Sequence, residues 1–294
     1  MLDRLDRMLV AVRDRAEAAD TFSAVLGAEK VGDDSIALYA ASRTTMRAGD
    51  SDFDLFEPSG DGPVAELLES RGEGIFGGGF STPDLDDLVR SLEDNSVAFA
   101  REGDSLYIEP DQTHGMRTAI RQSAPREPAG LISFVYEVTN VVDDHKAAND
   151  FYTRAFGLDQ SRFSPIDSDM WGYVGTLTLF NPPDRLDRIE ITQTTDSTRS
   201  MGRFYGRRGQ SIYMCFVETP DAGAIKERLD TRDGRYQQLT NDPAAGLYIH
   251  PSALHGILMG VSGTNVAWRW SGHPELAPTS ATGSSSRPAT SVAS

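Results

Sequence analysis

Charged side chains that could form an acid–base site stand on the same face of two short predicted strands. Arg188 and Glu190 alternate along one run, and Ser133 and Glu137 lie four residues apart along another. Because alternate side chains of a strand share a face, each run presents a carboxylate on one face. Two carboxylates beside a guanidinium in apolar surroundings can have different pKa values, as general acid–base catalysis requires. The alternative is a structural ion pair between Arg188 and Glu190, with Glu137 facing solvent.

Three arginines gather in a second candidate region at 201–209. This run contains Arg203, Arg207 and Arg208 in a protein that is otherwise acidic. Guanidinium groups in such a cluster can bind a carboxylate or a phosphate through paired hydrogen bonds. A solvated loop whose arginines pair with the abundant aspartates would explain the same residues.

The overall charge limits the classes of partner. The 294 residues include 44 acidic and 28 basic side chains, which gives a formal net charge of −16. Such an excess repels phosphate backbones and anionic lipid surfaces, so we expect neither nucleic acid nor a membrane as a partner. No apolar run approaches the length of a membrane span, and no apolar signal core precedes the first strand. We therefore expect a cytoplasmic protein that binds a small-molecule substrate. The sequence is compatible with either a monomer or a homo-oligomer.

The chain contains a strand–turn–strand motif twice. Leu247–Val261 reads LYIHPSALHGILMGV, and Leu106–Ile120 reads LYIEPDQTHGMRTAI. The Tyr, Pro and His-Gly positions match at one offset, 141 residues from Tyr107 to Tyr248. Together with a length near twice that of a usual domain, this repeat predicts two domains that are built alike.

Strand and helix signals recur in one order along the chain. An apolar run at 8–12 precedes a helix at 16–26 that ends at Gly27, and three short strands follow. The same order restarts at a glycine-rich strand over 75–82 and occurs twice more in the second half. The sequence therefore predicts four βαβββ modules in an α+β fold.

Changes in composition along the chain indicate where one domain ends and the next begins. We expect a first domain at 1–123, a linker at 124–130, a second domain at 131–272 and a tail at 273–294. The linker is rich in Pro and Gly. The tail is rich in Pro, Ser, Thr, Ala and Gly without periodicity, a composition that predicts disorder.

These modules resemble the vicinal oxygen chelate superfamily, which includes glyoxalase I, bleomycin-resistance proteins, methylmalonyl-CoA epimerase and extradiol dioxygenases. Asp54–Pro58 and the run at 62–74 are most similar to the epimerase, and four modules in one chain resemble the dioxygenases. The resemblance implies that paired modules form cup-shaped sheets around a divalent metal. It also implies that the strand faces carrying Glu137, Arg188 and Glu190 look into the cup of the second domain.

The resemblance places metal ligands at four positions in each domain, and few of these carry a ligand. They fall on Arg7, Asp54, Gly77 and Ala119 in the first domain, and on Ser133, Glu190, Met214 and Gly260 in the second. Such sites need three or four nitrogen and oxygen ligands that converge on one ion. We therefore expect no metal in either domain. A different register could instead place His255 beside Glu190 as a second ligand, although a structural role in its turn would also explain His255.

Three functions fit these residues. The first, which we expect, is a glyoxalase-like enzyme that moves a proton next to a carbonyl of a small oxygenated or CoA-linked metabolite, as an isomerase, epimerase or lyase without a metal. Its catalytic residues would be Glu190, Glu137 and Arg188, and its substrate-binding residues Ser133, Met214, Arg203 and His255. The second is a metal-dependent enzyme like the extradiol dioxygenases. The third is a non-catalytic small-molecule-binding protein, as in the bleomycin-resistance branch.

Overall fold

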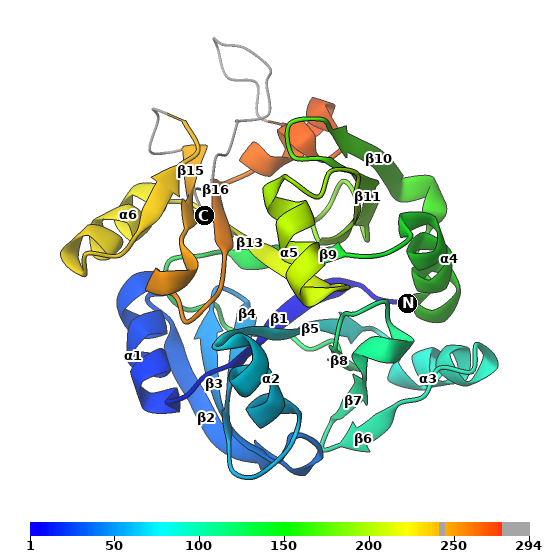
Figure 1. Cartoon of the computed structure of the whole chain (residues 1–294), viewed down its shortest axis with the longest axis horizontal. Helices are drawn as coiled ribbons and strands as arrows, with labels where there is room; N and C mark the ends of the chain where they lie inside the picture. Colours follow the sequence, from blue (N-terminus) through cyan, green and yellow to red (C-terminus); the bar gives the residue numbers. More distant parts are fainter. Residues whose placement is uncertain (241–244, 278–294) are drawn as a thin grey trace.

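The structure is a computed structural model that describes residues 1–240 and 245–277. Its two halves lie one above the other, with the N-terminal half in blue and cyan and the C-terminal half in green to orange (Figure 1). We call the sheet and helices of each half the first and the second domain. In each domain the strands of one curled sheet line a cup, as an α+β fold of paired βαβββ modules predicts.

The first domain contains an eight-stranded sheet. Its strands are β1 (Arg4–Ala11), β2 (Glu29–Ile36), β3 (Ala41–Ala48), β4 (Ser51–Pro58), β5 (Gly74–Thr82), β6 (Ala100–Glu102), β7 (Ser105–Ile108) and β8 (Thr118–Gln122). Its helices are α1 (Arg15–Leu26), α2 (Pro63–Arg71) and α3 (Leu85–Asp94). The strand order is β2-β3-β4-β1-β5-β8-β7-β6, so the two modules join along β1 and β5.

The second domain repeats this arrangement. Its strands are β9 (Phe134–Val141), β10 (Phe163–Ser168), β11 (Tyr173–Leu179), β12 (Arg188–Thr194), β13 (Ser211–Thr219), β14 (Tyr236–Gln238), β15 (Gly246–Ile249) and β16 (Met259–Gly263). Its helices are α4 (His145–Phe156), α5 (Ser200–Arg208) and α6 (Ala222–Thr231). The order β10-β11-β12-β9-β13-β16-β15-β14 matches that of the first domain strand for strand.

Equivalent helices begin and end through the same local chemistry. The carboxylate of Asp14 accepts hydrogen bonds from the first N–H groups of α1, and Asp144 does the same for α4. Gly27 and Gly157 end these helices in the left-handed conformation, at φ of 69° and 65°. The predicted helix at 16–26 is therefore confirmed to within one residue.

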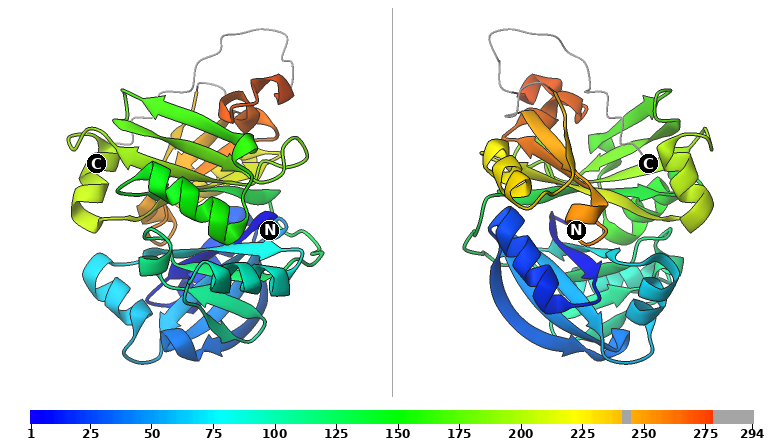
Figure 2. Two further views of the ribbon diagram at one scale, coloured as in Figure 1. Left: turned by 90° about the vertical axis from the view of Figure 1, so that its right-hand side faces the viewer. Right: turned by 60° about the vertical axis from the view of Figure 1, so that its left-hand side comes forward.

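One apolar core runs through both domains. α1 packs beside α6 and α3 beside α4, so that these helices lie along the junction between the two sheets (Figure 2). The buried side chains of this core come from both halves of the chain, among them Phe22, Leu88, Tyr152 and Ile225. Because neither domain closes this core alone, the two sheets are held as one body.

The repeated His-Gly turns, His114–Gly115 and His255–Gly256, join the domains. A Cβ atom on Gly256 would lie 1.9 Å from the carbonyl oxygen of Glu73, and one on Gly115 would lie 2.4 Å from that of Gln210. Both glycines have positive φ, 80° and 88°. Each turn therefore packs against the other domain at a distance that only glycine allows.

Short connections tie the linker and the start of the predicted tail to the body. In the linker, Ala129 pairs with Gly49 as an isolated β-bridge, and the N–H of Leu131 donates to Leu26. A short 3₁₀ turn at Pro274–Leu276 lies within the predicted tail. Residues 278–294 of that tail lie outside the described residues. Within the described residues, every helix is too short or too polar to cross a membrane.

Candidate active site

Ion pairs and aromatic rings fill the cup of the first domain. Arg7 is 3% exposed, and its Nη1 donates to Asp54 at 3.0 Å, while its Nε donates to Asp6 at 3.2 Å. Burial alone would lower the pKa of Arg7, but the surrounding carboxylates outweigh burial and raise it. Buried aromatic side chains pack beyond this pair: Tyr39, Phe56, Phe76 and Tyr107. The first cup is thus occupied by the protein itself.

The glycine-rich strand β5 makes room for Arg7. A Cβ atom on Gly79 would lie 1.9 Å from Cγ of Arg7, and one on Gly77 would lie 2.6 Å from the carbonyl oxygen of Arg117. Glycine is required at Gly79 because the Arg7 side chain crosses the strand there.

In the second cup, a strand register brings the predicted charged residues together. β9 and β12 are parallel, and they pair Glu137 with Arg188 and Thr139 with Glu190. Nε of Arg188 donates to Oε2 of Glu137 at 2.6 Å, and Nη2 lies 2.5 Å from the same oxygen. The hydroxyl of Thr139 donates to Glu190 at 3.1 Å and lies 3.4 Å from Glu137. Arg188 therefore pairs with Glu137, and Thr139 links Glu137 to Glu190.

All three charged side chains are buried. Arg188 is 0% exposed, Glu137 2% and Glu190 3%. The guanidinium carbon of Arg188 lies 5.2 Å from the centre of the Tyr136 ring, whose hydroxyl shares a hydrogen bond of 2.8 Å with Ser262. A buried ion pair is held in one geometry because leaving either partner unpaired costs several kcal/mol. Arg188 therefore fixes Glu137 and, through Thr139, the strand face that carries Glu190.

Glu190 and Thr139 line an inner pocket of about 60 Å³. Its other walls are mostly apolar and aromatic: Trp171, Tyr173, Tyr213, Met214, Phe216, Tyr248 and Leu258, with Ser200 and Met201 at the start of α5. Met214 was predicted to bind the substrate, and it lines this pocket. A carboxylate in the wall of a mostly apolar pocket is suited to accept a proton from a bound molecule.

Two of the predicted substrate-binding residues lie elsewhere. Ser133 precedes β9, where its N–H donates to Glu218 at 2.7 Å and its carbonyl accepts from Asp50 at 3.0 Å. His255 has a φ of 44°, and its ring nitrogens lie 2.9 Å from Glu73 and 3.2 Å from Thr21. Both residues therefore lie at the junction of the two domains and not among those that line the inner pocket.

Strand pairing corrects the predicted register of the second domain. Arg7 pairs with Gly79 in the first domain, and the equivalent strands pair Glu137 with Phe216. The counterpart of Arg7 is therefore Glu137 rather than Ser133. β9 carries a bulge beside this position, between the pairs Glu137–Phe216 and Val135–Val217, as β1 does between Leu5 and Arg7.

The corrected positions do not fit a divalent metal. Glu137 and Glu190 supply carboxylates, but Glu137 is already bound by Arg188, and Met214 and Gly260 offer no hard ligand. A Cβ atom on Gly260 would lie 2.1 Å from the Phe216 ring, so this ring covers the fourth position. Among the described residues, no three His, Cys, Asp or Glu side chains converge on one point. The prediction that the protein works without a metal still awaits metal analysis.

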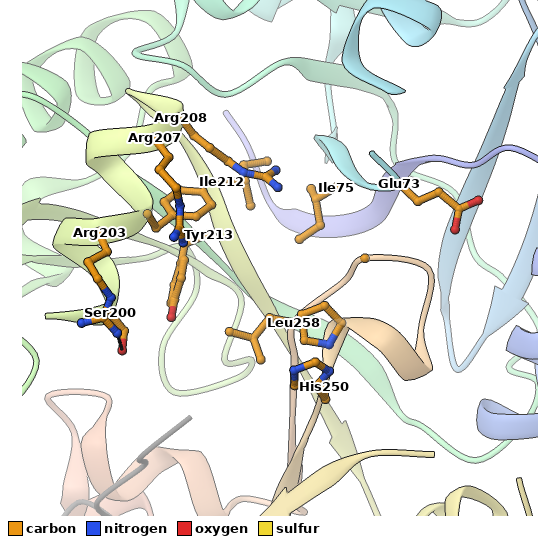
Figure 3. Close-up of a pocket in the computed structure, with 13 residues that line it drawn as sticks. Glu73, Ile75, Ser200, Arg203, Arg207, Arg208, Ile212, Tyr213, His250 and Leu258 are labelled. Atoms are coloured by element: carbon orange, nitrogen blue, oxygen red, sulfur yellow. Dashed lines mark hydrogen bonds between the residues drawn. The ribbon is translucent and has the colours of Figure 1, made fainter. Parts of the chain in front are cut away.

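An outer pocket of about 390 Å³ adjoins the inner one. Ser200, Tyr213 and Leu258 line both. The arginines predicted at 201–209 lie on α5, which forms one wall of the outer pocket, and Leu258 and His250 lie across from them (Figure 3). The region is therefore a helix and not the loop that one interpretation assumed.

Some of the lining residues could have been found from sequence and others could not. Thr139 alternates with Glu137 along β9, so the same-face argument applied to Glu137 also reaches it. Tyr136 shares the cup with Glu137 only because of the bulge, which leaves no sequence signal. Tyr248 lies within the repeated motif, whose position relative to the cup depends on sheet pairing.

Several solved structures resemble this chain. A triple mutant of 4-hydroxymandelate synthase from Streptomyces coelicolor matches with a TM-score of 0.68 and 12% identity, over 89% of this chain and 92% of that one. A variant of methylmalonyl-CoA epimerase from the same organism, in complex with 2-nitronate-propionyl-CoA, matches with a TM-score of 0.39 and 24% identity, over 42% of this chain and 100% of that one. Methylmalonyl-CoA epimerase from Mycobacterium tuberculosis matches with a TM-score of 0.40 and 20% identity, over 47% of this chain and 92% of that one.

Sequence comparisons give no relative. No family model matches the chain, and no curated protein matches it.

Proposed function

We propose that this chain, which has the fold of the vicinal oxygen chelate superfamily, is an enzyme that moves a proton next to a carbonyl group of a small oxygenated metabolite. The reaction would be an epimerisation, an isomerisation or an elimination by a lyase. The observation that carries the proposal is the placement of Glu190 in the wall of the inner pocket, with its carboxylate bonded to Thr139.

Glu190 acts as the base in this reaction. Its carboxylate removes a proton from the carbon next to the carbonyl, which leaves an enolate. In an epimerisation or isomerisation, the same proton or one from solvent returns to that carbon or to a neighbouring one. In an elimination, the enolate expels a leaving group from the adjacent carbon, and the proton passes to that group or to solvent. Thr139 holds the carboxylate in place. Arg188 is a positioning residue, because it touches Glu137 and not the pocket.

Tyr213 can stabilise the carbonyl oxygen of the substrate during the reaction. Tyr213 lines both pockets, and burial raises its pKa, so its hydroxyl keeps its proton at neutral pH. A protonated phenol can donate a hydrogen bond to the carbonyl oxygen as negative charge develops on it. The chemistry therefore needs only groups that the chain supplies.

Hydrogen exchange tests the proposal without knowledge of the natural substrate. The purified protein is incubated in D₂O with a panel of 2-oxo acids, 2-hydroxy ketones and acyl thioesters, and deuterium uptake is followed by NMR. We expect uptake next to the carbonyl of at least one compound, at a rate that EDTA does not change.

Other outcomes point to the competing functions. Exchange that EDTA abolishes and an added divalent metal restores would favour the metal-dependent enzyme. Tight binding of a panel compound, or of a co-purified molecule seen by native mass spectrometry, with no exchange at all would favour the binding protein.

A further inference from the structure

The outer pocket carries uncompensated positive charge. Arg203, Arg207 and Arg208 of α5 line it, and none of them forms an ion pair with a carboxylate among the described residues. Glu73 lines the same pocket, but its carboxylate bonds to His255 and to the N–H of Arg13. In Figure 3 that carboxylate points away from the arginines.

A fourth arginine, Arg71 of the first domain, contacts the end of α5 from an adjoining pocket. Nη2 of Arg71 donates to the carbonyl of Arg208 at 3.0 Å, and Nη2 of Arg208 donates to the carbonyl of Arg71 at 3.3 Å. These reciprocal bonds hold two cationic side chains together across the domain junction. Burial lowers the pKa of Arg208, and the neighbouring charges of Arg71 and Arg207 lower it further.

This arrangement contrasts with the arginines around the first cup. Arg7, Arg43, Arg47, Arg121 and Arg126 each lie within ion-pair distance of at least one carboxylate. The chain has 16 more acidic than basic residues, so carboxylates are available to neutralise arginines. The last turn of a helix favours basic residues, which accounts for Arg207 and Arg208 on α5 and for Arg71 on α2, but not for the meeting of these two helix ends.

We infer that the arginine cluster of the outer pocket, formed by Arg203, Arg207 and Arg208 with Arg71 behind Arg208, binds a phosphate group of the substrate. Guanidinium groups bind phosphate through paired, charge-assisted hydrogen bonds, and a dianion can use several at once, whereas one carboxylate needs only one. The inference rests on the proposed function for the role of the ligand as substrate.

The shared walls of the two pockets define the substrate class. Ser200, Tyr213 and Leu258 line both pockets, so a single molecule can place its phosphate at the arginines and its carbonyl end beside Glu190. The substrate would then be a phosphate-bearing carbonyl compound. Binding energy at the remote phosphate would orient the reacting carbon.

Binding of inorganic probes tests this site directly. We expect pyrophosphate, measured by titration calorimetry on the full chain at 0.15 M KCl, to bind in a saturable manner. The double variant Arg207→Gln/Arg208→Gln should weaken that binding at least tenfold, because it removes two groups that can form charge-assisted hydrogen bonds to the phosphate. The single variant Arg207→Gln, an exposed position without a described hydrogen bond, should weaken it severalfold without affecting folding.

Controls separate this site from overall charge and from catalysis. Arg90→Gln removes an exposed arginine of α3 that pairs with Asp87, and it should bind pyrophosphate as the wild type does. Glu190→Gln should also keep pyrophosphate binding while losing exchange activity, so the two proposals can fail separately. The inference is overturned if the wild type binds no pyrophosphate, if Arg90→Gln weakens binding as much as the double variant, or if succinate binds as tightly as pyrophosphate.

Discussion

At the scale of single residues, the Glu137–Arg188 pair determines what the second cup can be. Both side chains are buried, and Arg188 is enclosed completely. A guanidinium in this position neutralises a carboxylate at one of the metal-ligand positions that the sequence resemblance implied. The charge of Glu137 is thus balanced by the chain, while Glu190 lines the inner pocket.

Removal of Arg188 should be costly for stability. Arg188→Met leaves Glu137 as an unpaired buried carboxylate, so we expect the free energy of unfolding in urea to fall by about 3–5 kcal/mol. The double variant Glu137→Met/Arg188→Met removes both charges and should recover most of that loss. If the two single losses simply add in the double variant, the pair is not coupled as described.

Residue patterns predicted the charged residues of this cup better than the residues expected to bind substrate beside them. Strand alternation correctly brought Glu137, Arg188 and Glu190 to one surface, because a two-residue period does not depend on the rest of the fold. Ser133 was wrongly placed in the cup, because the bulge in β9 turns the residues before it to the other face of the sheet. His255 was wrongly placed there because its turn packs on the other domain. Neither the bulge nor the domain contact leaves a periodic signal in the sequence.

At the scale of elements, the repeated His-Gly turn is a contact between domains. Gly256 lies where a side chain would meet the main chain of Glu73, and its φ of 80° is strained for other residues. Gly103 has a φ of 60°, but nothing lies within 4 Å of its Cβ position. The two glycines both have a positive φ, but only Gly256 lies close to the main chain of another residue.

This difference gives a matched pair of variants. Gly103→Ala should lower the free energy of unfolding by about 1 kcal/mol, through backbone strain alone. Gly256→Ala should lower it by at least about 2 kcal/mol more, because the turn must also move away from Glu73. Equal losses in thermal or urea unfolding would show that the junction adjusts without cost.

The helix α5 shows the limit of local patterns. Gly202 and Gly206 lower helix propensity, and no side chain caps its N-terminus, so the sequence gives little sign of a helix. Close packing explains one of these glycines, since a Cβ atom on Gly202 would lie 2.1 Å from the carbonyl oxygen of Asp196. The element that carries the arginines is therefore set by tertiary contacts.

At the scale of the whole molecule, the two domains are connected through buried polar groups as well as a shared core. Asp187 of the second domain accepts a hydrogen bond of 2.9 Å from the N–H of Leu5 in the first. Arg185 pairs with Asp187 at 2.5 Å and with Asp50 of the first domain at 2.6 Å. Burial raises the pKa of Asp187 to about 6, in spite of the opposing charge of Arg185.

This pKa predicts a pH dependence of stability. Because the folded pKa of Asp187 lies above its unfolded value of 3.8, the folded state binds the proton more tightly. The resulting contribution is present below about pH 4 and is lost as the pH rises through about 6, a change of about 3 kcal/mol. Asp187→Asn cannot titrate, so the stability of the wild type relative to this variant should fall by that amount between pH 4 and 7. A constant difference would contradict the pKa.

The repeat predicted two similar domains, and the matching strand orders confirm this architecture. The sequence could not show how the domains pack. Apolar positions of α1, α3, α4 and α6 look the same whether a helix covers its own sheet alone or also faces another domain. The junction, and with it the outer pocket between α5 and the first domain, becomes visible only in three dimensions.

The central claim is that Glu190 moves a proton without a metal, and one comparison tests it most directly. Wild type and Glu190→Gln are assayed side by side for deuterium uptake into a panel compound that the wild type labels, and metal content is measured on the same samples. Glutamine keeps the size of the side chain and removes the base, so we predict that exchange falls about a hundredfold or more, with unchanged unfolding and no stoichiometric metal in either protein. Exchange at the wild-type rate, or a stoichiometric metal that the substitution releases, would contradict the account.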